Sequence, residues 1–293
     1  MKRKLFILLM LVSLVYLFIQ TRETNDLEKR HSNGEIVGET AIVFNQENGQ
    51  LLYSKNEDAL VYPASTTKIM TALVALEFGN LDDKITVGEE VEMEVEGESS
   101  AFLQQNQTYT LRQLLSALML PSGNDAARTI AVYIAKLESG AESASNKEAI
   151  AHFVSLMNAK AKELGATDTH FVNPSGLHDH NHYTTASDMG LIVREAMNNE
   201  VFKEIVKQDQ YSDQNVTFNN TNLLLQRDSS FYYEGADGIK TGFTNEAGRC
   251  LVSSATVDGK TIISIIFKST EEAIWQDSAL LLDYGFYAMK TGE

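Results

Sequence analysis

The sequence contains a single cysteine, three prolines and few basic residues, and these shortages exclude several classes of protein. One cysteine, Cys250, cannot form an intramolecular disulfide or a cysteine-based metal cage. The 24 Lys and Arg residues stand against 40 Asp and Glu residues, which gives a formal net charge of -16. Because a protein that binds nucleic acid needs a concentrated basic face, no nucleic-acid partner is expected. The hydrophobic share of 43% is that of an ordinary globular protein.

The first twenty residues have the layout of an export signal. Three cations at positions 2–4 precede an apolar run over residues 5–19. As a helix this run reaches roughly 22 Å, less than a hydrocarbon core of roughly 30 Å, which favours a signal peptide. No small-x-small cleavage site follows, so an uncleaved membrane anchor is the equal alternative. We therefore expect residues 1–20 to be a signal peptide or anchor, residues 21–34 a linker and residues 35–293 the exported domain.

Hydrophobic periodicity predicts strands at both ends of this domain and helices between them. Strands are expected at Thr40–Phe44, Leu51–Ser54, Arg249–Val257 and Thr261–Lys268, the last two joined by a turn at Asp258-Gly259. Helices are expected at Thr67–Phe78, Leu111–Leu120, Asp125–Leu137, Lys147–Leu164, Ala186–Met197 and Glu271–Tyr287. Strands that do not alternate with helices argue against a parallel sheet. The expected fold class is α/β of the α+β type, an antiparallel sheet with an inserted helical lobe.

An acidic run over residues 89–98 alternates Glu with apolar residues. Glu92, Glu94 and Glu96 are separated by Met93 and Val95, which is a period of two. Runs of like charge usually face water, so a solvated edge strand or loop is expected here rather than a cation site.

The first chemical motif is Ser65-Thr66-Thr67-Lys68, at the expected start of a helix directly after Pro63. Residues three apart lie on one helical face, so the Lys68 amine can reach the Ser65 hydroxyl and accept its proton. The helix amino terminus adds positive potential where an alkoxide would develop.

The second and third motifs are Ser122-Gly123-Asn124 and Lys240-Thr241-Gly242. The second lies in a short break between two expected helices, and taken alone it also fits an ordinary turn with an asparagine cap. The third stands ahead of an expected strand. Its lysine and threonine supply a cation and a hydroxyl suited to a carboxylate, and its glycine allows close approach of a ligand to the backbone.

The order Ser-x-x-Lys, Ser-x-Asn, Lys-Thr-Gly is the signature of the penicillin-recognising serine acyl enzymes. The wider sequence resembles one branch of them, the serine D-alanyl-D-alanine carboxypeptidases, which are small penicillin-binding proteins of bacterial walls. The resemblance covers about residues 35 to 290, and the stretches that carry it are residues 63–71, 121–127, 171–179 and 239–244. It implies a five-stranded antiparallel sheet flanked by helices, with an all-helical lobe, and it makes residues 35–293 the catalytic domain.

The resemblance also implies the role of each motif residue. Ser65 would attack the carbonyl between two D-alanines, Lys68 would be the base, Ser122 a proton relay and Asn124 a contact to the substrate amide and to Lys68. Lys240 and Thr241 would bind the terminal carboxylate, beside Gly242. The backbone N–H groups of Ser65 and Phe243 would form the oxyanion hole. A lysine base needs a lowered pKa, and burial or the charge of Lys240 could supply it.

The implied partners are the peptidoglycan stem peptide and, as covalent inhibitors, β-lactam antibiotics. The implied location is the extracytoplasmic face of the bacterial membrane or the wall, with membrane contact through residues 5–19 if they are retained. The chain ends soon after Lys240, so the further β-rich domain and terminal amphipathic helix of many relatives are not expected.

Three alternatives compete with this hypothesis. A class A β-lactamase would carry Ser-Asp-Asn as second motif and a glutamate base on a loop that residues 164–169 do not match. A slow penicillin-binding sensor module is compatible with the same side chains and stays open. A metallopeptidase is suggested by His178, His180 and His182, but no other residues of metal spacing accompany them, so we expect hydrogen-bonding histidines, no metal and no cofactor.

Overall fold

The computed structural model describes residues 36–291. Its centre is a five-stranded antiparallel sheet in the order β2-β1-β9-β8-β7. The strands are β1 (Thr40–Asn45), β2 (Leu51–Lys55), β7 (Ala236–Thr244), β8 (Gly248–Val257) and β9 (Lys260–Ser269). The first strand pairs with the last one, so the sheet joins both ends of the domain, and the expected fold class is confirmed.

The tight turn between β8 and β9 follows from its two residues. Val257 pairs with Lys260, and the two residues between them, Asp258 and Gly259, have φ values of 52 and 73. Two successive positive φ angles are those of a type I′ turn, whose twist matches that of the flanking strands. The Asp-Gly pair thus sets the register of the two central strands.

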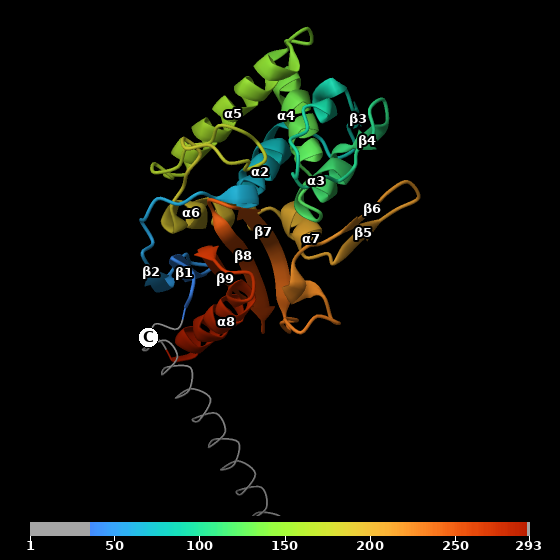
Figure 1. Cartoon of the computed structure of the whole chain (residues 1–293). Coiled ribbons are helices and arrows are strands. Elements are labelled where there is room, and N and C mark those ends of the chain that lie inside the picture. The colour runs from blue at the N-terminus through green and yellow to red at the C-terminus, as the bar shows by residue number, and fades with distance from the viewer. Residues whose placement is uncertain (1–35, 292–293) are drawn as a thin grey trace, which may run out of the picture.

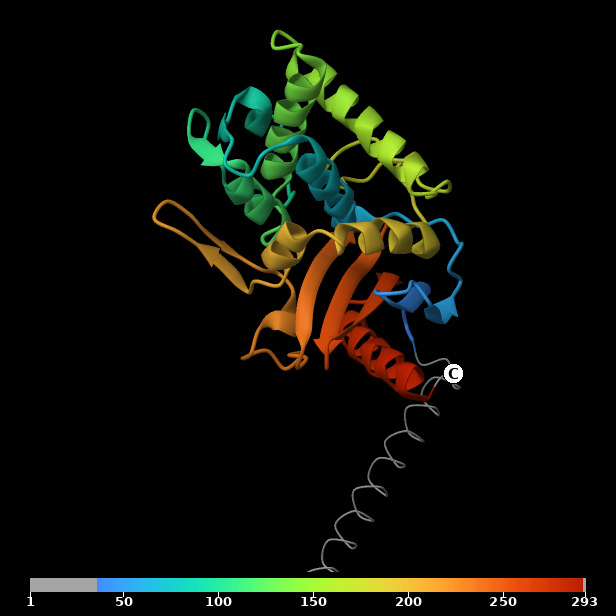
Figure 2. The same cartoon turned by 180° about the vertical axis from the view of Figure 1, so that it is seen from behind.

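Helices cover both faces of the sheet (Figures 1 and 2). On one face lies α8 (Ala273–Thr291), which contacts β1, β2, β8 and β9. On the other face α6 (Ala186–Ala196) contacts β1 and β9, and α7 (Glu200–Val206) contacts β7. The apolar residues form two clusters, one between the sheet and α8 and a larger one between the sheet and the helical lobe. Burial on both faces explains why Ile262–Phe267 of β9 is apolar except for Ser264.

The inserted lobe consists of η1 (Ala64–Thr67), α2 (Lys68–Phe78), η2 (Glu89–Glu92), α3 (Leu111–Met119), α4 (Asn124–Ser139) and α5 (Asn146–Glu163). It stands above one end of the sheet (Figures 1 and 2), where η1 contacts β7 and β8. The capping box expected at Thr110 and Gln113 is present at the start of α3. Two small two-stranded antiparallel sheets complete the fold, β3 (Lys84–Thr86) with β4 (Thr108–Thr110) and β5 (Gln210–Ser212) with β6 (Thr217–Asn219). A 3₁₀ turn, η3 (Leu223–Leu225), precedes β7.

All six expected helices and all four expected strands are present, with ends that differ by up to four residues. The sequence did not predict β7, α7 or the strand pairs β3–β4 and β5–β6. Within residues 36–291 no helix is both long and apolar enough to cross a membrane. The expected signal peptide or anchor (1–20) and the linker (21–34) lie outside the described residues.

Candidate active site

Ser65 lies in the 3₁₀ turn η1, and Lys68 is the first residue of the α-helix that follows it. The turn is held by Thr66, whose hydroxyl donates to the Pro63 carbonyl at 2.7 Å. Ala64 has a φ of 47, a left-handed conformation that costs a non-glycine residue about 1 kcal/mol or more. This bend places Ser65 Oγ 3.0 Å from Lys68 Nζ, as the Ser-x-x-Lys spacing predicted.

Lys68 is completely buried, and its Nζ atom has three oxygen neighbours. Besides Ser65 Oγ, these are Asn124 Oδ1 at 2.6 Å and the Ser175 carbonyl at 2.8 Å. Burial above all, and the nearby Lys240 cation next, hold the pKa of Lys68 well below its usual value. The two amine hydrogens of a neutral lysine satisfy Asn124 and Ser175, because both oxygens can only accept. Its lone pair is then left for the hydroxyl proton of Ser65.

The second motif occupies the break between α3 and α4. Ser122 has a φ of 67 and lines the cleft beside Ser65. Its buried Oγ atom has no hydrogen-bond partner among the described residues. Asn124 is the first residue of α4, and its amide bridges Lys68 on one side and Glu98 on the other, where Nδ2 donates to Glu98 Oε2 at 3.1 Å.

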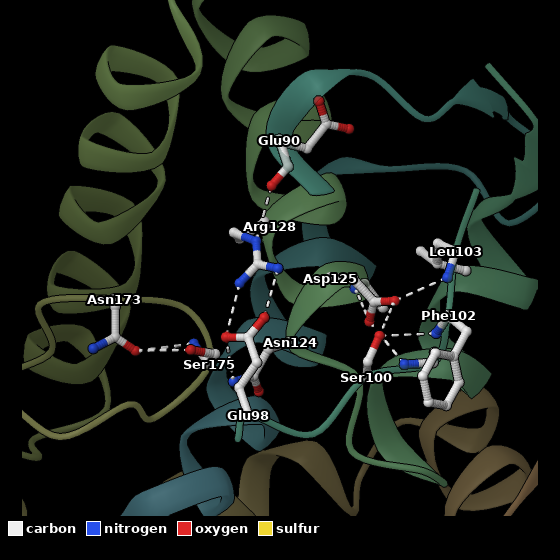
Figure 3. A network of polar contacts seen from close by, with 12 residues as sticks. Glu90, Glu98, Ser100, Phe102, Leu103, Asn124, Asp125, Arg128, Asn173 and Ser175 are labelled. Carbon is white, nitrogen blue, oxygen red and sulfur yellow. Dashed lines mark hydrogen bonds and ion pairs between the residues drawn. The ribbon is translucent and has the colours of Figure 1, made fainter. Parts of the chain in front are cut away.

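The acidic run is exposed over residues 92–97, as its charge indicated, but two of its glutamates are buried. Glu89–Glu92 is the 3₁₀ helix η2, in which Glu90 is buried, and Glu98 forms a buried ion pair with Arg128 of α4 (Figure 3). The expectation of a solvated edge strand or loop is therefore wrong at both positions. The cause is an unforeseen buried cation: Arg128 reaches Glu98 with two nitrogens and the Glu90 carbonyl with a third.

The third motif lies inside β7, and the strand expected after it is present as β8. Lys240 is 1% exposed, and its Nζ donates to the Thr241 carbonyl at 3.0 Å. Burial lowers the pKa of Lys240 to about 7. The Thr241 hydroxyl lies 2.6 Å from that of Thr221, a residue that no sequence motif indicated. A β-carbon on Gly242 would lie 3.1 Å from the Ser65 nitrogen, so this glycine lets the strand pass close to Ser65.

The loop around residues 173–177 completes the site, and only the family resemblance had indicated it. The Asn173 side-chain oxygen accepts from the backbone N–H groups of Ser175 and Gly176 at 3.1 and 2.7 Å. Gly176 has a φ of 87, and a β-carbon there would lie 1.8 Å from the Ala64 oxygen. The loop therefore presses against the bend that carries Ser65 and directs the Ser175 carbonyl at Lys68.

The three motifs meet along a cleft of about 920 Å³. Ser65, Ser122, Asn124, Thr241, Gly242 and Phe243 line it, whereas the buried lysines lie behind its surface. Phe243 is half exposed, with the Arg249 guanidinium 4.4 Å above its ring. The sequence thus predicted every motif residue that the fold brings together, and the resemblance included the stretch with Ser175, but Glu98, Arg128 and Thr221 were missed.

The histidines proposed for a metallopeptidase have other contacts. His182 is buried and bonds Thr67 through Nε2 at 2.8 Å, while the ring of His178 packs edge-on against Tyr62 and against His180. No group of three or more His, Cys, Asp or Glu side chains within residues 36–291 is arranged to hold a metal ion.

Comparison with known proteins assigns this arrangement to a family. The sequence profile described as D-alanyl-D-alanine carboxypeptidase matches residues 27–271. The chain belongs to the D-alanyl-D-alanine carboxypeptidase family of serine peptidases. It is 37% identical over 258 residues to the D-alanyl-D-alanine carboxypeptidase of Streptomyces sp. K15, covering 83% of this chain and 85% of that protein. It is 33% identical to DacF of Bacillus subtilis over 276 residues, 90% of this chain and 66% of that protein.

Solved structures of the same family have the same fold. The crystal structure of the Streptomyces K15 DD-transpeptidase superposes with a TM-score of 0.78 at 35% identity, covering 86% of this chain and 98% of that one. The D-alanyl-D-alanine carboxypeptidase of Mycobacterium tuberculosis gives 0.73 at 33% identity, over 85% and 91%. The D-alanyl-D-alanine carboxypeptidase fold expected from the motifs is thus confirmed.

The class A β-lactamase alternative finds no support in the geometry. Glu163, which precedes the loop at 164–169, ends α5 and pairs with Lys160, with its side chain 64% exposed. It is not among the residues that line the cleft. The described structure therefore does not place Glu163 as a base for rapid hydrolysis of an acyl-enzyme.

Proposed function

We propose that this chain removes the terminal D-alanine from peptidoglycan stem pentapeptides through an acyl-enzyme on Ser65. Membership of the family assigns the activity class, a D-Ala-D-Ala carboxypeptidase of the serine type. One observation carries the mechanism: Lys68 is buried with a depressed pKa, and its Nζ lies 3.0 Å from Ser65 Oγ. A lysine whose pKa is depressed loses its proton more readily and can act as a general base at that distance.

The reaction has two halves. Ser65 Oγ bonds to the carbonyl carbon between the two D-alanines, and Lys68 Nζ takes the hydroxyl proton. The carbon–nitrogen bond then breaks, and the proton passes through Ser122 to the leaving amine of D-alanine. Water afterwards hydrolyses the ester and returns Ser65 to its free form. The unpartnered Ser122 hydroxyl, buried at the cleft wall, supports the relay.

The remaining motif residues hold the substrate. Lys240 and Thr241 bind the terminal carboxylate with a cation and a hydroxyl. The backbone N–H groups of Ser65 and Phe243 stabilise the oxyanion, and the close approach of Gly242 to the Ser65 nitrogen supports this pairing. Asn124 contacts the substrate amide while its oxygen keeps Lys68 in place.

The same chemistry defines the partners and the place of action. β-Lactams present a strained amide to Ser65 and become covalent inhibitors by the same attack. Because peptidoglycan lies outside the cytoplasmic membrane, the enzyme acts there. The proposed organisation is a signal peptide or membrane anchor over residues 1–20, a linker over residues 21–34 and a catalytic domain over residues 35–293, at the outer face of the membrane or in the wall.

A release assay tests the proposal directly. The full chain in mild detergent is incubated with an N-acetylated Lys-D-Ala-D-Ala peptide, and free D-alanine is measured, with Ser65→Ala as control. The wild type should release D-alanine and the variant should not. Penicillin labelling without any release of D-alanine would replace the carboxypeptidase by a slow sensor module. A penicillin adduct that decays within milliseconds would indicate a β-lactamase.

A further inference from the structure

A buried ion pair stands directly behind the second motif. The Glu98 side chain is 0% exposed and that of Arg128 is 7% exposed. Two nitrogens of Arg128 reach the two carboxylate oxygens at 2.7 and 3.0 Å. A buried pair of this kind is weak evidence for stability, because desolvation of both charges offsets most of their attraction. Its position beside the reacting groups therefore calls for another explanation.

The pair determines how the Asn124 amide is oriented (Figure 3). Glu98 Oε2 lies 3.1 Å from Asn124 Nδ2, and a carboxylate can only accept. The NH₂ end of the amide must therefore face Glu98, which leaves Oδ1 facing Lys68 at 2.6 Å. A reversed amide would direct its hydrogens at the amine of Lys68 and an oxygen at the carboxylate. Glu98 thus selects the orientation in which Asn124 accepts a hydrogen from a neutral Lys68 and leaves the amine lone pair for Ser65.

The backbone around the pair is fixed from two sides. Arg128 stands one turn beyond Asn124 on α4, and its Nε donates to the Glu90 carbonyl at 2.9 Å. The Asp125 carboxylate accepts from the backbone N–H groups of Ala101 and Leu103, both at 2.9 Å. These bonds tie the segment that carries Glu98 to the start of α4, as the labelled contacts of Figure 3 show. Because the Glu98 carboxylate is held in place in this way, it can position the Asn124 amide.

The pair also contributes to the charge around Lys68. The charged groups that act on Lys68 come from three elements: Lys240 of β7, Asp125 and Arg128 of α4, and Glu98 of the intervening loop. Glu98 raises the pKa of Lys68, whereas Arg128 lowers it. The two members therefore oppose each other, while burial is the largest influence on the pKa of Lys68.

We propose that Glu98 and Arg128 are positioning residues for the acylation step, which fix the amide orientation of Asn124 and balance the charge beside Lys68. Neither residue needs to touch the leaving D-alanine or its carboxylate. The proposal rests on the proposed function, since it assigns a role relative to Lys68 as the base. The proposal thus assigns a function to Glu98, a buried member of the acidic run, which the composition of that run did not indicate.

The test uses charge-neutralising variants of similar shape. Glu98→Gln, Arg128→Met and the double variant are compared with the wild type in the full chain. Glu204→Gln is the matched control, because Glu204 pairs with Arg112 at 3.2 Å on the surface between α3 and α7. The second-order rate of acylation by a fluorescent penicillin is measured across the pH range, and a thermal melt confirms that each variant is folded.

The two single variants should move the acid limb of the rate profile in opposite directions. Loss of the Glu98 anion lowers the pKa of Lys68, so the limb moves to lower pH, by about one pH unit. Loss of the Arg128 cation leaves Glu98 unbalanced, so the limb moves to higher pH by a similar amount. In the double variant the midpoint of the acid limb should lie near that of the wild type. The maximal rate should fall about tenfold or more in each single variant, because a misplaced amide costs that much.

A purely structural role would lower the melting temperature and the rate without moving the limb, and that result would overturn the proposal. A shift of both variants in one direction would overturn it as well. The Glu204 control should match the wild type throughout. If the wild type itself is not acylated, the proposed function fails. If it is acylated normally while the single variants keep its midpoint, only the role of Glu98 and Arg128 fails.

Discussion

The burial of Lys240 predicts that reaction with anionic ligands weakens as the pH rises above neutrality. Lys240 is 1% exposed, and burial lowers its pKa to about 7, far below that of a lysine in water. A lysine with a depressed pKa is charged below that value and loses its proton and its charge as the pH rises through it. The cation proposed to receive the substrate carboxylate is therefore present in acid and lost in mild alkali.

The size of the effect follows from the pKa. Lys240 is about half protonated at pH 7, about one tenth at pH 8 and about one hundredth at pH 9. If only the charged form receives the carboxylate, the second-order rate of acylation by a penicillin falls roughly fifty-fold between pH 7 and pH 9. Deprotonation of Lys68 acts in the opposite direction, because its neutral form is the proposed base. The fall in the acylation rate on the alkaline side thus reports the deprotonation of Lys240.

The assay is stopped-flow acylation by a fluorescent penicillin from pH 6 to about pH 9.5, with spontaneous hydrolysis subtracted. Lys240→Arg keeps a cation throughout, because the guanidinium pKa stays above about 12. This variant should lose the alkaline fall, and Lys240→Met should be slow at every pH. A wild-type rate that stays constant up to pH 9, or a Lys240→Arg profile with the same fall, would refute the reasoning. Near-ultraviolet circular dichroism at each pH shows whether the fold is retained.

Three further outcomes are expected. Lys68→Ala should lower the rate of penicillin acylation by about 10²- to 10⁴-fold while the fold is retained, since it removes the proposed base. Gly176→Ala should lower the melting temperature by more than the 2–4 °C expected for about 1 kcal/mol of φ strain alone, because its β-carbon would lie 1.8 Å from a backbone oxygen. Burial lowers the pKa of His182 to about 4, so the unfolded chain binds the extra proton between pH 6.5 and 4. The free energy of unfolding should therefore fall by about 3 kcal/mol over that range, and His182→Gln should lose this dependence.

Each of these expectations has a control or an opposing result. Normal acylation of Lys68→Ala would remove it from the role of base. Gly259→Ala is the matched glycine variant, with a φ of 73 but nothing within 4 Å of the added carbon, and an equal loss in both variants would show that the contact at Gly176 is harmless. Urea midpoints measured at several pH values test His182, and an identical slope in wild type and variant would contradict the assignment.

Much of the fold was predictable because its signals are local. The Asp258-Gly259 turn, the Thr110 capping box and the periodic helices each depend on residues within a few positions of one another. β7 escaped prediction because its sequence, Ala236–Thr244, carries two glycines and two charged residues that depress strand propensity. Its strand conformation depends on pairing with β8, which is tertiary information.

Site residues could be predicted where they belong to a contiguous motif. They could not be predicted where the fold brings them together from distant segments. Ser65, Lys68, Ser122, Asn124 and Lys240 were identified because their spacing is short or their order is that of a known family. The ion pair behind Asn124 was missed, since an acidic run is usually solvated and no local pattern connects it to a helix further along the chain. Only the fold shows that the segment turns inward at the start of α4.

The reactive lysine gathers contacts from parts of the chain that are far apart in sequence. Lys68 meets Asn124 at a separation of 56 residues and Ser175 at a separation of 107. Such long-range contacts form only when the lobe, the loop and the helix have docked, whereas helices can form earlier. A penicillin added during refolding would therefore label only chains whose tertiary assembly is complete. The rate at which labelled chains appear would measure the last step of folding, separately from the formation of secondary structure.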